Sequence, residues 1–142
     1  TRVGDPFVMD KALEENTAIA GEPNGHYSVL EFVPYNSGTL TALMIAGLDI
    51  ESELNEIPHR SVQRDSIEVE DKHERIESLK KVLAEDYNIL SEKDGVKAKV
   101  GYANVLIRPS GSSPKLRIIS EAADEDTAQA SLGEAKEIIR NS

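Results

Sequence analysis

The stretch that decides the fold reads Asn104-Val-Leu-Ile-Arg-Pro-Ser-Gly-Ser-Ser-Pro-Lys-Leu-Arg-Ile-Ile119. Two apolar runs flank a short loop of glycine, serine and proline, which is typical of two strands joined by a tight connection. A hairpin folded about the middle of that loop places Ile107 opposite Ile118 and Arg108 opposite Arg117. The stretch therefore predicts a pair of antiparallel strands with this register.

The same register brings cations together. Like charges directly opposite each other on a strand pair repel, and Lys115 shares a strand face with Arg117 because side chains two residues apart point the same way. Three cations can lie close together beside a Ser/Gly loop if an anion between them offsets their repulsion. Phosphate suits guanidinium groups and exposed backbone N–H groups. The simpler alternative is a solvated loop whose charges splay into water.

The overall composition excludes several classes of protein. The chain has 142 residues, 39% of them hydrophobic, and a formal net charge of −10. This acidity argues against nucleic acid or an anionic membrane as a partner. The absence of cysteine excludes disulfides and thiol chemistry. No apolar run has the length of a membrane span and no signal peptide is visible, so we expect a cytoplasmic protein.

The first third of the chain alternates helices and strands, as in an α/β unit. The predicted elements are a helix over 6–16 capped by Asp5, strands over 18–20 and 27–33, and a helix over 38–48 capped by Ser37. The helix over 38–48 is apolar nearly all round, so we expect it to be buried.

The rest of the chain has a different pattern. Charged residues and Pro58 over 51–65 indicate a hinge or linker, and residues 66–142 are predicted to form an α+β domain. Its expected fold is an antiparallel four-stranded sheet with two helices on one face. Asp71 is placed to cap the first helix, and Asp94-Gly95 predicts a hairpin turn. The predicted elements are a short strand over 67–69, a helix burying Ile76, Leu79, Val82 and Leu83, strands over 87–90 and 96–100, the hairpin, and a helix over 124–140 burying Ala128, Leu132, Ala135 and Ile139.

A second polar motif is Gly21-Glu-Pro-Asn-Gly-His26. Glu22, Asn24 and His26 recur at every second position, so an extended turn would point all three the same way. A carboxylate, a carboxamide and an imidazole can together bridge the vicinal hydroxyls of a sugar. The alternative is an ordinary Asx-type turn with a surface histidine. Sugar hydroxyls at one motif and phosphate at the other describe a phosphosugar.

Four segments, in order, resemble the C-terminal part of the α-D-phosphohexomutases, the phosphomannomutase/phosphoglucomutase superfamily. The similar motifs of that family are T-x-V-G-D for Thr1–Asp5, G-E-x-S-G-H for Gly21–His26, D-G-x-x-T-A-L for Ser37–Leu43 and R-P-S-G-T-E-P-K-x-R for Arg108–Arg117. Three residues depart from the family pattern. Asn24 replaces a serine, Ser37 replaces an aspartate and Ser113 replaces a glutamate.

The resemblance implies a role for each segment. Residues 1–50 would be the C-terminal portion of the family's α/β sugar-recognition domain 3, residues 51–65 a hinge, and residues 66–142 the phosphate-binding domain 4. The implied sugar-binding residues are Glu22, Asn24 and His26. The implied holders of the phosphate that is not transferred are Arg108, Ser110, Gly111, Ser112 and Arg117.

The resemblance also implies what this chain lacks. The family's enzymes interconvert hexose 1-phosphates and 6-phosphates through a bisphosphate, using a phosphoserine loop (T-A-S-H-N-P) and a magnesium loop (D-G-D-x-D-R). Neither string occurs here. We therefore expect no catalytic residue and no metal ligand in this chain, and expect it to be a fragment that works with N-terminal domains of a parent isomerase. The alternatives are a stand-alone phosphosugar-binding or regulatory module, and an interaction domain whose site has decayed.

Overall fold

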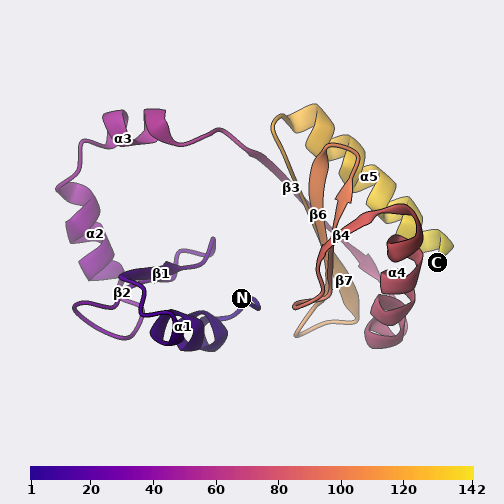
Figure 1. The fold of residues 1–142 in the computed structure, drawn as a ribbon, viewed down its shortest axis with the longest axis horizontal. Helices are drawn as coiled ribbons and strands as arrows, with labels where there is room; N and C mark the ends of the chain where they lie inside the picture. Colours follow the sequence, from indigo (N-terminus) through magenta and orange to yellow (C-terminus); the bar gives the residue numbers. More distant parts are fainter. The chain divides into compact units, whose positions relative to one another are not determined.

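The structure is a computed structural model that describes all 142 residues. They form two compact units, residues 1–58 and residues 59–142. The first unit mixes short helices and strands, and the second is an α+β domain (Figure 1). The fold class predicted from the sequence is therefore confirmed. None of the helices combines the length and apolar character that crossing a membrane requires.

The first unit contains three helices and a two-stranded antiparallel sheet. The helices are α1 (Asp5–Glu14), α2 (Gly38–Ala46) and α3 (Ile50–Glu56), and the strands are β1 (Ile19–Gly21) and β2 (Tyr27–Val29). Ser37 caps α2 as predicted, since its hydroxyl accepts a hydrogen bond from the Leu40 amide at 3.3 Å. Gly21 pairs with Tyr27, which closes the connection that carries the motif of Glu22, Asn24 and His26.

Helix α2 is the main departure from the sequence prediction in this unit. None of its residues is buried, and Leu43 is 69% exposed. The prediction of a buried helix is therefore wrong for this chain. Within the unit α2 packs chiefly against the short strand β2. One strand of three residues cannot cover a helix that is apolar on all sides.

Two further boundaries differ from the prediction. Gly4, not Asp5, is the N-cap of α1, and no side chain caps this helix. The strand predicted over 27–33 ends at Val29, because the chain turns there: the amides of Phe32 and Val33 both donate to the Val29 carbonyl at 3.0 Å.

The second unit is built on a five-stranded antiparallel sheet. Its strands, in spatial order, are β3 (Ser61–Glu68), β7 (Lys115–Ala122), β6 (Ala103–Pro109), β5 (Val96–Val100) and β4 (Asn88–Ser91). The prediction had four strands. The edge strand β3 is longer than the expected 67–69, because its pairing with β7 begins at Ser61 opposite Ala122. Residues 51–65, predicted as a linker, thus hold most of α3 and the first part of β3.

Helices α4 (Lys72–Asp86) and α5 (Glu125–Asn141) cover one face of this sheet (Figure 1). Asp71 caps α4 as predicted. Asp124 caps α5, a role that the sequence prediction did not give it. The buried stripe of α5 is also confirmed, whereas in α4 Val82 is 38% exposed. The shared core includes Leu79, Leu83, Val96, Val105, Ile107, Leu116, Ile118 and Ile139.

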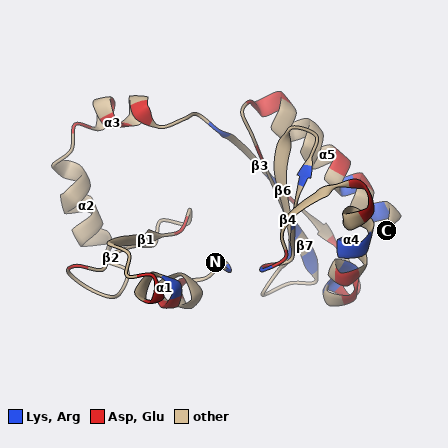
Figure 2. Ribbon diagram, in the orientation of Figure 1, with Lys and Arg blue, Asp and Glu red and all other residues tan.

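The other face of the sheet carries no helix, and we call it the open face. Strand alternation directs the residues between the buried positions of β5, β6 and β7 toward it. Its basic side chains are Arg64, Lys97, Lys99, Arg108, Lys115 and Arg117. Figure 2 shows basic segments on β7. This concentration of positive charge lies in a chain whose formal net charge is −10.

Candidate functional site

The β6–β7 connection has the register predicted from the sequence. Arg108 pairs with Arg117, and Ile107 pairs with Ile118. The loop between the strands is closed at its base by the Ser110 amide, which donates to the Lys115 carbonyl at 2.9 Å. The Lys115 amide in turn donates to the Ser113 carbonyl at 2.9 Å. Residues 110–114 therefore form a defined loop, which we call the serine loop.

The interior of the serine loop is held by its own hydroxyls. Ser110 is buried, and the Ser113 hydroxyl donates to the Ser110 hydroxyl oxygen at 2.9 Å. The amides of Gly111, Ser112 and Ser113 donate no hydrogen bond within the chain. A Cβ at Gly111 would meet no atom within 4 Å. Three consecutive free amides in a loop with open space at Gly111 are suited to the oxygens of an anion.

Lys72, the first residue of α4, also contacts the serine loop. Its ammonium group donates to the Ser110 carbonyl at 2.6 Å and to the Ser113 carbonyl at 3.4 Å. The sequence prediction did not include this residue. The one available signal was its position, because a cation in the first turn of a helix is unfavourable to the helix dipole and calls for another partner.

Arg108 is the most enclosed cation of the site. Its side chain is 16% exposed, and one terminal nitrogen lies 3.8 Å from a carboxylate oxygen of Asp94. Its Nε is buried and has no hydrogen-bond partner. A buried N–H without an acceptor is costly, so this guanidinium is better satisfied when an anion is present.

An open pocket of about 590 Å³ lies on the open face beside the serine loop. Four of its lining residues are basic: Arg64, Arg108, Lys115 and Arg117. Lys115 is paired with Glu68 at 3.3 Å, whereas Arg64 and Arg117 have no partner. Arg64 was missed from the sequence because it lies in the segment read as a linker. Of the predicted residues, Arg108 and Arg117 line this pocket. Ser110, Gly111 and Ser112 lie in the serine loop, whose Ser113 also lines the pocket. Arg64 is a further lining residue, and Lys72 contacts the loop.

The β1–β2 connection is a compact polar turn. The Glu22 amide donates to the His26 carbonyl at 2.9 Å, and Gly25 has a φ of +92°, which glycine adopts most readily. The Asn24 carboxamide accepts from the His26 amide at 3.0 Å and donates to Glu22 at 3.2 Å. The Asx-type turn considered as the simpler alternative is therefore present, and it holds the three predicted sugar-binding residues together.

Glu22 is the buried member of this turn. It is 7% exposed, and its Oε1 accepts a hydrogen bond from the Gly4 amide at 2.8 Å. Because Asn24 donates to Oε2, both carboxylate oxygens are engaged. The turn is thereby fixed to the start of α1.

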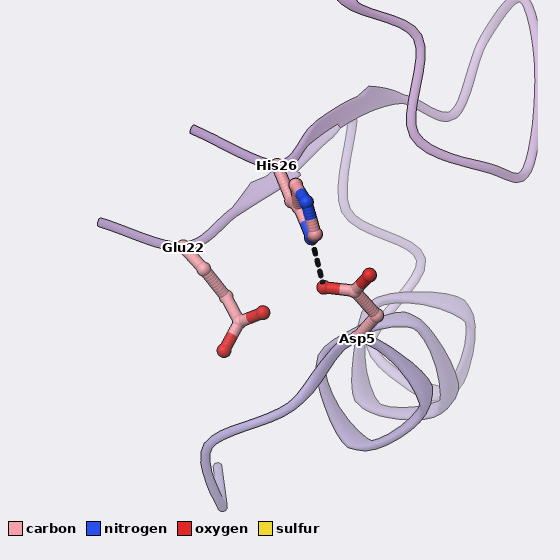
Figure 3. A group of neighbouring side chains, drawn as sticks. All are labelled: Asp5, Glu22 and His26. Atoms are coloured by element: carbon pink, nitrogen blue, oxygen red, sulfur yellow. Dashed lines mark hydrogen bonds and ion pairs between the residues drawn. The ribbon is translucent and has the colours of Figure 1, made fainter. Parts of the chain in front are cut away.

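Asp5 joins the same cluster (Figure 3). The Nδ1–H of His26 donates to Oδ1 of Asp5 at 2.8 Å. This hydrogen bond is the main reason why the pKa of Asp5 is held below its ordinary value. An ionised carboxylate only accepts hydrogen bonds, so the proton lies on Nδ1 and Nε2 is left for a ligand. The sequence prediction placed Asp5 at a helix cap and missed this role.

Asp5, Glu22 and His26 also bring three possible metal ligands together. One ligand atom from each lies within 4.8 Å of the others. The sequence showed no cluster of this kind because Asp5 is distant in the chain. Mg²⁺ requires near-octahedral oxygen coordination and rarely takes an imidazole, so this group does not fit the family's magnesium.

Two family models cover nearly the whole chain. Residues 1–64 match the α/β/α domain III of phosphoglucomutase/phosphomannomutase, and residues 66–137 match the C-terminal domain of the same family. The chain therefore belongs to the phosphoglucomutase/phosphomannomutase family.

Several relatives of the chain carry the name phosphoglucosamine mutase. The chain is 35% identical over 148 residues to a probable phosphoglucosamine mutase of Methanopyrus kandleri, covering 99% of this chain and 33% of the relative. It is 30% identical over 129 residues to the phosphoglucosamine mutase of Clostridium tetani, covering 89% and 28%. The chain thus spans about a third of the length of these relatives.

The fold is also shared with a solved structure. A crystal structure of a phosphoglucomutase/phosphomannomutase family protein from Burkholderia thailandensis matches with a TM-score of 0.78. The match has 18% identity and covers 98% of this chain and 31% of that one. At this identity the likeness supports the fold alone.

Proposed function

We propose that this chain supplies the sugar- and phosphate-recognition elements of a phosphohexomutase, an intramolecular phosphotransferase that interconverts hexose 1-phosphates and 6-phosphates through a bisphosphate. The observation that carries the proposal is the serine loop, where three free amides lie beside Arg108, whose Nε is buried without a partner. Membership of the phosphoglucomutase/phosphomannomutase family supports the same reading.

In this proposal the phosphate that is not transferred binds at the serine loop. Its oxygens accept from the loop amides and from the guanidinium groups of Arg108 and Arg117, which suit phosphate geometry. Ser110, Gly111 and Ser112 provide the loop itself. Ser113 stands where the family has a glutamate. Its hydroxyl supports Ser110 and leaves one negative charge fewer near the anion.

The polar turn recognises the sugar in the same proposal. Glu22 contacts hydroxyls through the lone pairs that its two hydrogen-bonded carboxylate oxygens still have, and His26 does so through Nε2. Asn24 has both ends of its carboxamide engaged inside the turn. It therefore acts mainly by holding Glu22 and His26 in position.

We propose an amino hexose phosphate as the preferred substrate. The relatives' names include phosphoglucosamine mutase, and the turn combines the carboxylates of Asp5 and Glu22. A carboxylate pair attracts the protonated amine of an amino sugar more than it attracts a neutral hydroxyl.

The catalytic step lies outside this chain in our proposal. The phosphoserine and magnesium motifs are absent from the sequence, and the Asp5 cluster does not fit magnesium, so we derive no step through that metal. We propose residues 1–50 as the sugar-recognition portion and residues 66–142 as the phosphate domain. Of the predicted hinge, residues 57–60 carry neither helix nor strand.

The proposal is tested by titrating the isotopically labelled chain with glucosamine 6-phosphate and following its amide resonances. We expect shifts concentrated over residues 108–117, and weaker shifts with glucose 6-phosphate at the β1–β2 turn. No shift in the serine loop at millimolar ligand would exclude the phosphate assignment. In an enzyme that includes the phosphoserine and magnesium loops, Arg108→Ala should reduce turnover and substrate affinity. A stand-alone binding module would instead bind without any link to turnover.

A further inference from the structure

We infer that Lys72 is a positioning residue of the serine loop: it holds the loop carbonyls on one side, so that the loop amides face the anion on the other. The inference rests on the proposed phosphate site and adds a residue that no family motif quoted above contains. Lys72 lies 38 residues before Ser110 in the sequence. The inference therefore gives helix α4 a part in anion recognition.

The contacts of Lys72 are specific to the loop. Its ammonium group donates to the carbonyls of Ser110 and Ser113, at 2.6 Å and 3.4 Å. It forms no ion pair with any carboxylate, although the neighbouring residues Glu70, Asp71 and Glu74 are acidic. A lysine that served only solubility would extend into water.

The hydrogen bond from Lys72 to the Ser110 carbonyl fixes the direction of the next peptide N–H. In a trans peptide the C=O and the following N–H point in opposite directions. Because the Ser110 carbonyl points at Lys72, the Gly111 N–H points away from it. That amide has no acceptor in the chain and lies beside open space. If the peptide between Ser110 and Gly111 turned over, a carbonyl oxygen would face the phosphate and repel it.

The position of Lys72 in its own helix supports this role. Lys72 directly follows the N-cap Asp71, and a cation in the first turn is disfavoured by the helix dipole. Helix stability therefore gives no reason for a lysine here. Its positive charge also lies behind the loop, where it adds to the attraction for an anion.

The test compares three variants of the full chain: Lys72→Met, Lys72→Arg and Lys81→Met. Lys81 is exposed on the same helix and contacts neither a carboxylate nor the loop, so its variant removes the same charge at a different place. Each protein is titrated with inorganic phosphate and with glucosamine 6-phosphate. The amide resonances of Gly111 and Ser112 are recorded before and after ligand addition, and thermal unfolding checks that each variant folds.

We expect Lys72→Met to weaken binding about tenfold or more, as loss of charged hydrogen bonds implies. It should also move the ligand-free amide resonances of Gly111 and Ser112. Lys72→Arg should retain most of the affinity, and Lys81→Met should match the wild type. If Lys72→Met unfolds, Lys72→Gln is measured in its place, because its amide can still donate to one carbonyl.

The outcomes separate this inference from the proposed function. If the wild type shows no loop shift with either ligand, the phosphate site itself fails and the role of Lys72 fails with it. If the wild type binds and Lys72→Met binds equally well, only the positioning role is overturned. An equal loss in Lys81→Met and Lys72→Met also overturns it, because net charge alone would then explain the effect.

Discussion

Arg108 lies directly opposite Arg117 across the central strand pair of the second unit. Two like charges at a directly opposed position destabilise a strand pair. Arg108 is partly balanced by Asp94, whereas Arg117 has no partner. A bound anion between them would remove the repulsion, so the pair links the stability of the hairpin to ligand binding.

Replacing Arg117 by glutamine should therefore separate stability from binding. We expect the free energy of unfolding to stay the same or to rise by about 0.2–1 kcal/mol, since a cross-strand repulsion is removed. Phosphate affinity should fall about tenfold. Urea unfolding and phosphate titration measure the two effects. Lys99→Gln, on the same face of β5, serves as the control and should change neither; a loss of stability in Arg117→Gln would contradict the argument.

The backbone beneath Arg108 is equally constrained. Gly95 has a φ of +85°, and a Cβ there would lie 2.2 Å from the Ile107 carbonyl oxygen and 2.7 Å from the Arg108 Cα. Gly95→Ala should cost at least about 1–3 kcal/mol of unfolding free energy through backbone strain, and should displace Arg108 enough to weaken phosphate binding. Gly133, within α5, serves as the contrasting position, because a Cβ added there would contact no atom within 4 Å. Gly133→Ala should instead stabilise by about 0.5–1 kcal/mol. Thermal unfolding of both variants decides between these outcomes.

Local sequence signals predicted the parts of the fold that depend on neighbours in the chain. Asp71 is a helix cap, and Asp94-Gly95 lies in the turn that joins β4 and β5. The hairpin register followed from the symmetry of two apolar runs. Strand β3 could not be found this way: Ser61 to Ser66 show no clear alternation, and their pairing with β7 is a contact between distant segments.

Burial was predicted correctly for the core residues of α4 that meet the sheet, and wrongly for α2. The apolar stripe of α4 meets the sheet, and Leu79 is fully buried, whereas Leu43 of α2 is 69% exposed. Leu79→Ala should cost about 2–5 kcal/mol, and Leu43→Ala less than about 0.5 kcal/mol. Urea unfolding followed by amide resonances from each unit measures both. A large effect of Leu43→Ala would show that α2 is covered in solution.

The candidate site was predicted as two motifs, and its supporting residues were not. Asp5 meets His26 across 21 residues, and Lys72 meets Ser110 across 38. Neither pairing has a periodicity that a sequence could show. A motif identifies the residues that face a ligand, whereas the residues that hold them come from other elements and are revealed by the fold.

Arg64 offers a direct test of a pocket residue that the sequence prediction missed. It lines the pocket beside the serine loop and has no partner in the chain. Arg64→Gln should weaken phosphate binding several-fold, because one of the four cations around the pocket is lost. Arg60 carries the same charge just outside β3, so Arg60→Gln is the matched control and should retain wild-type affinity. Equal losses in the two variants would indicate a general charge effect.

The helix cap Asp124 makes the stability of the second unit depend on pH. Hydrogen bonds from the Thr127 amide, and then from its hydroxyl, lower the pKa of Asp124. A folded-state pKa below the unfolded value means that the cap stabilises fully above the unfolded pKa of about 3.9 and is lost as pH falls through the folded pKa. Asp124→Ala should therefore lower Tm at pH 7, with the difference from wild type shrinking below about pH 4. Asp124→Asn caps without ionising, so it should keep most of the Tm and remove this pH dependence. A Tm difference between Asp124→Ala and wild type that stays constant down to pH 2 would refute the assignment.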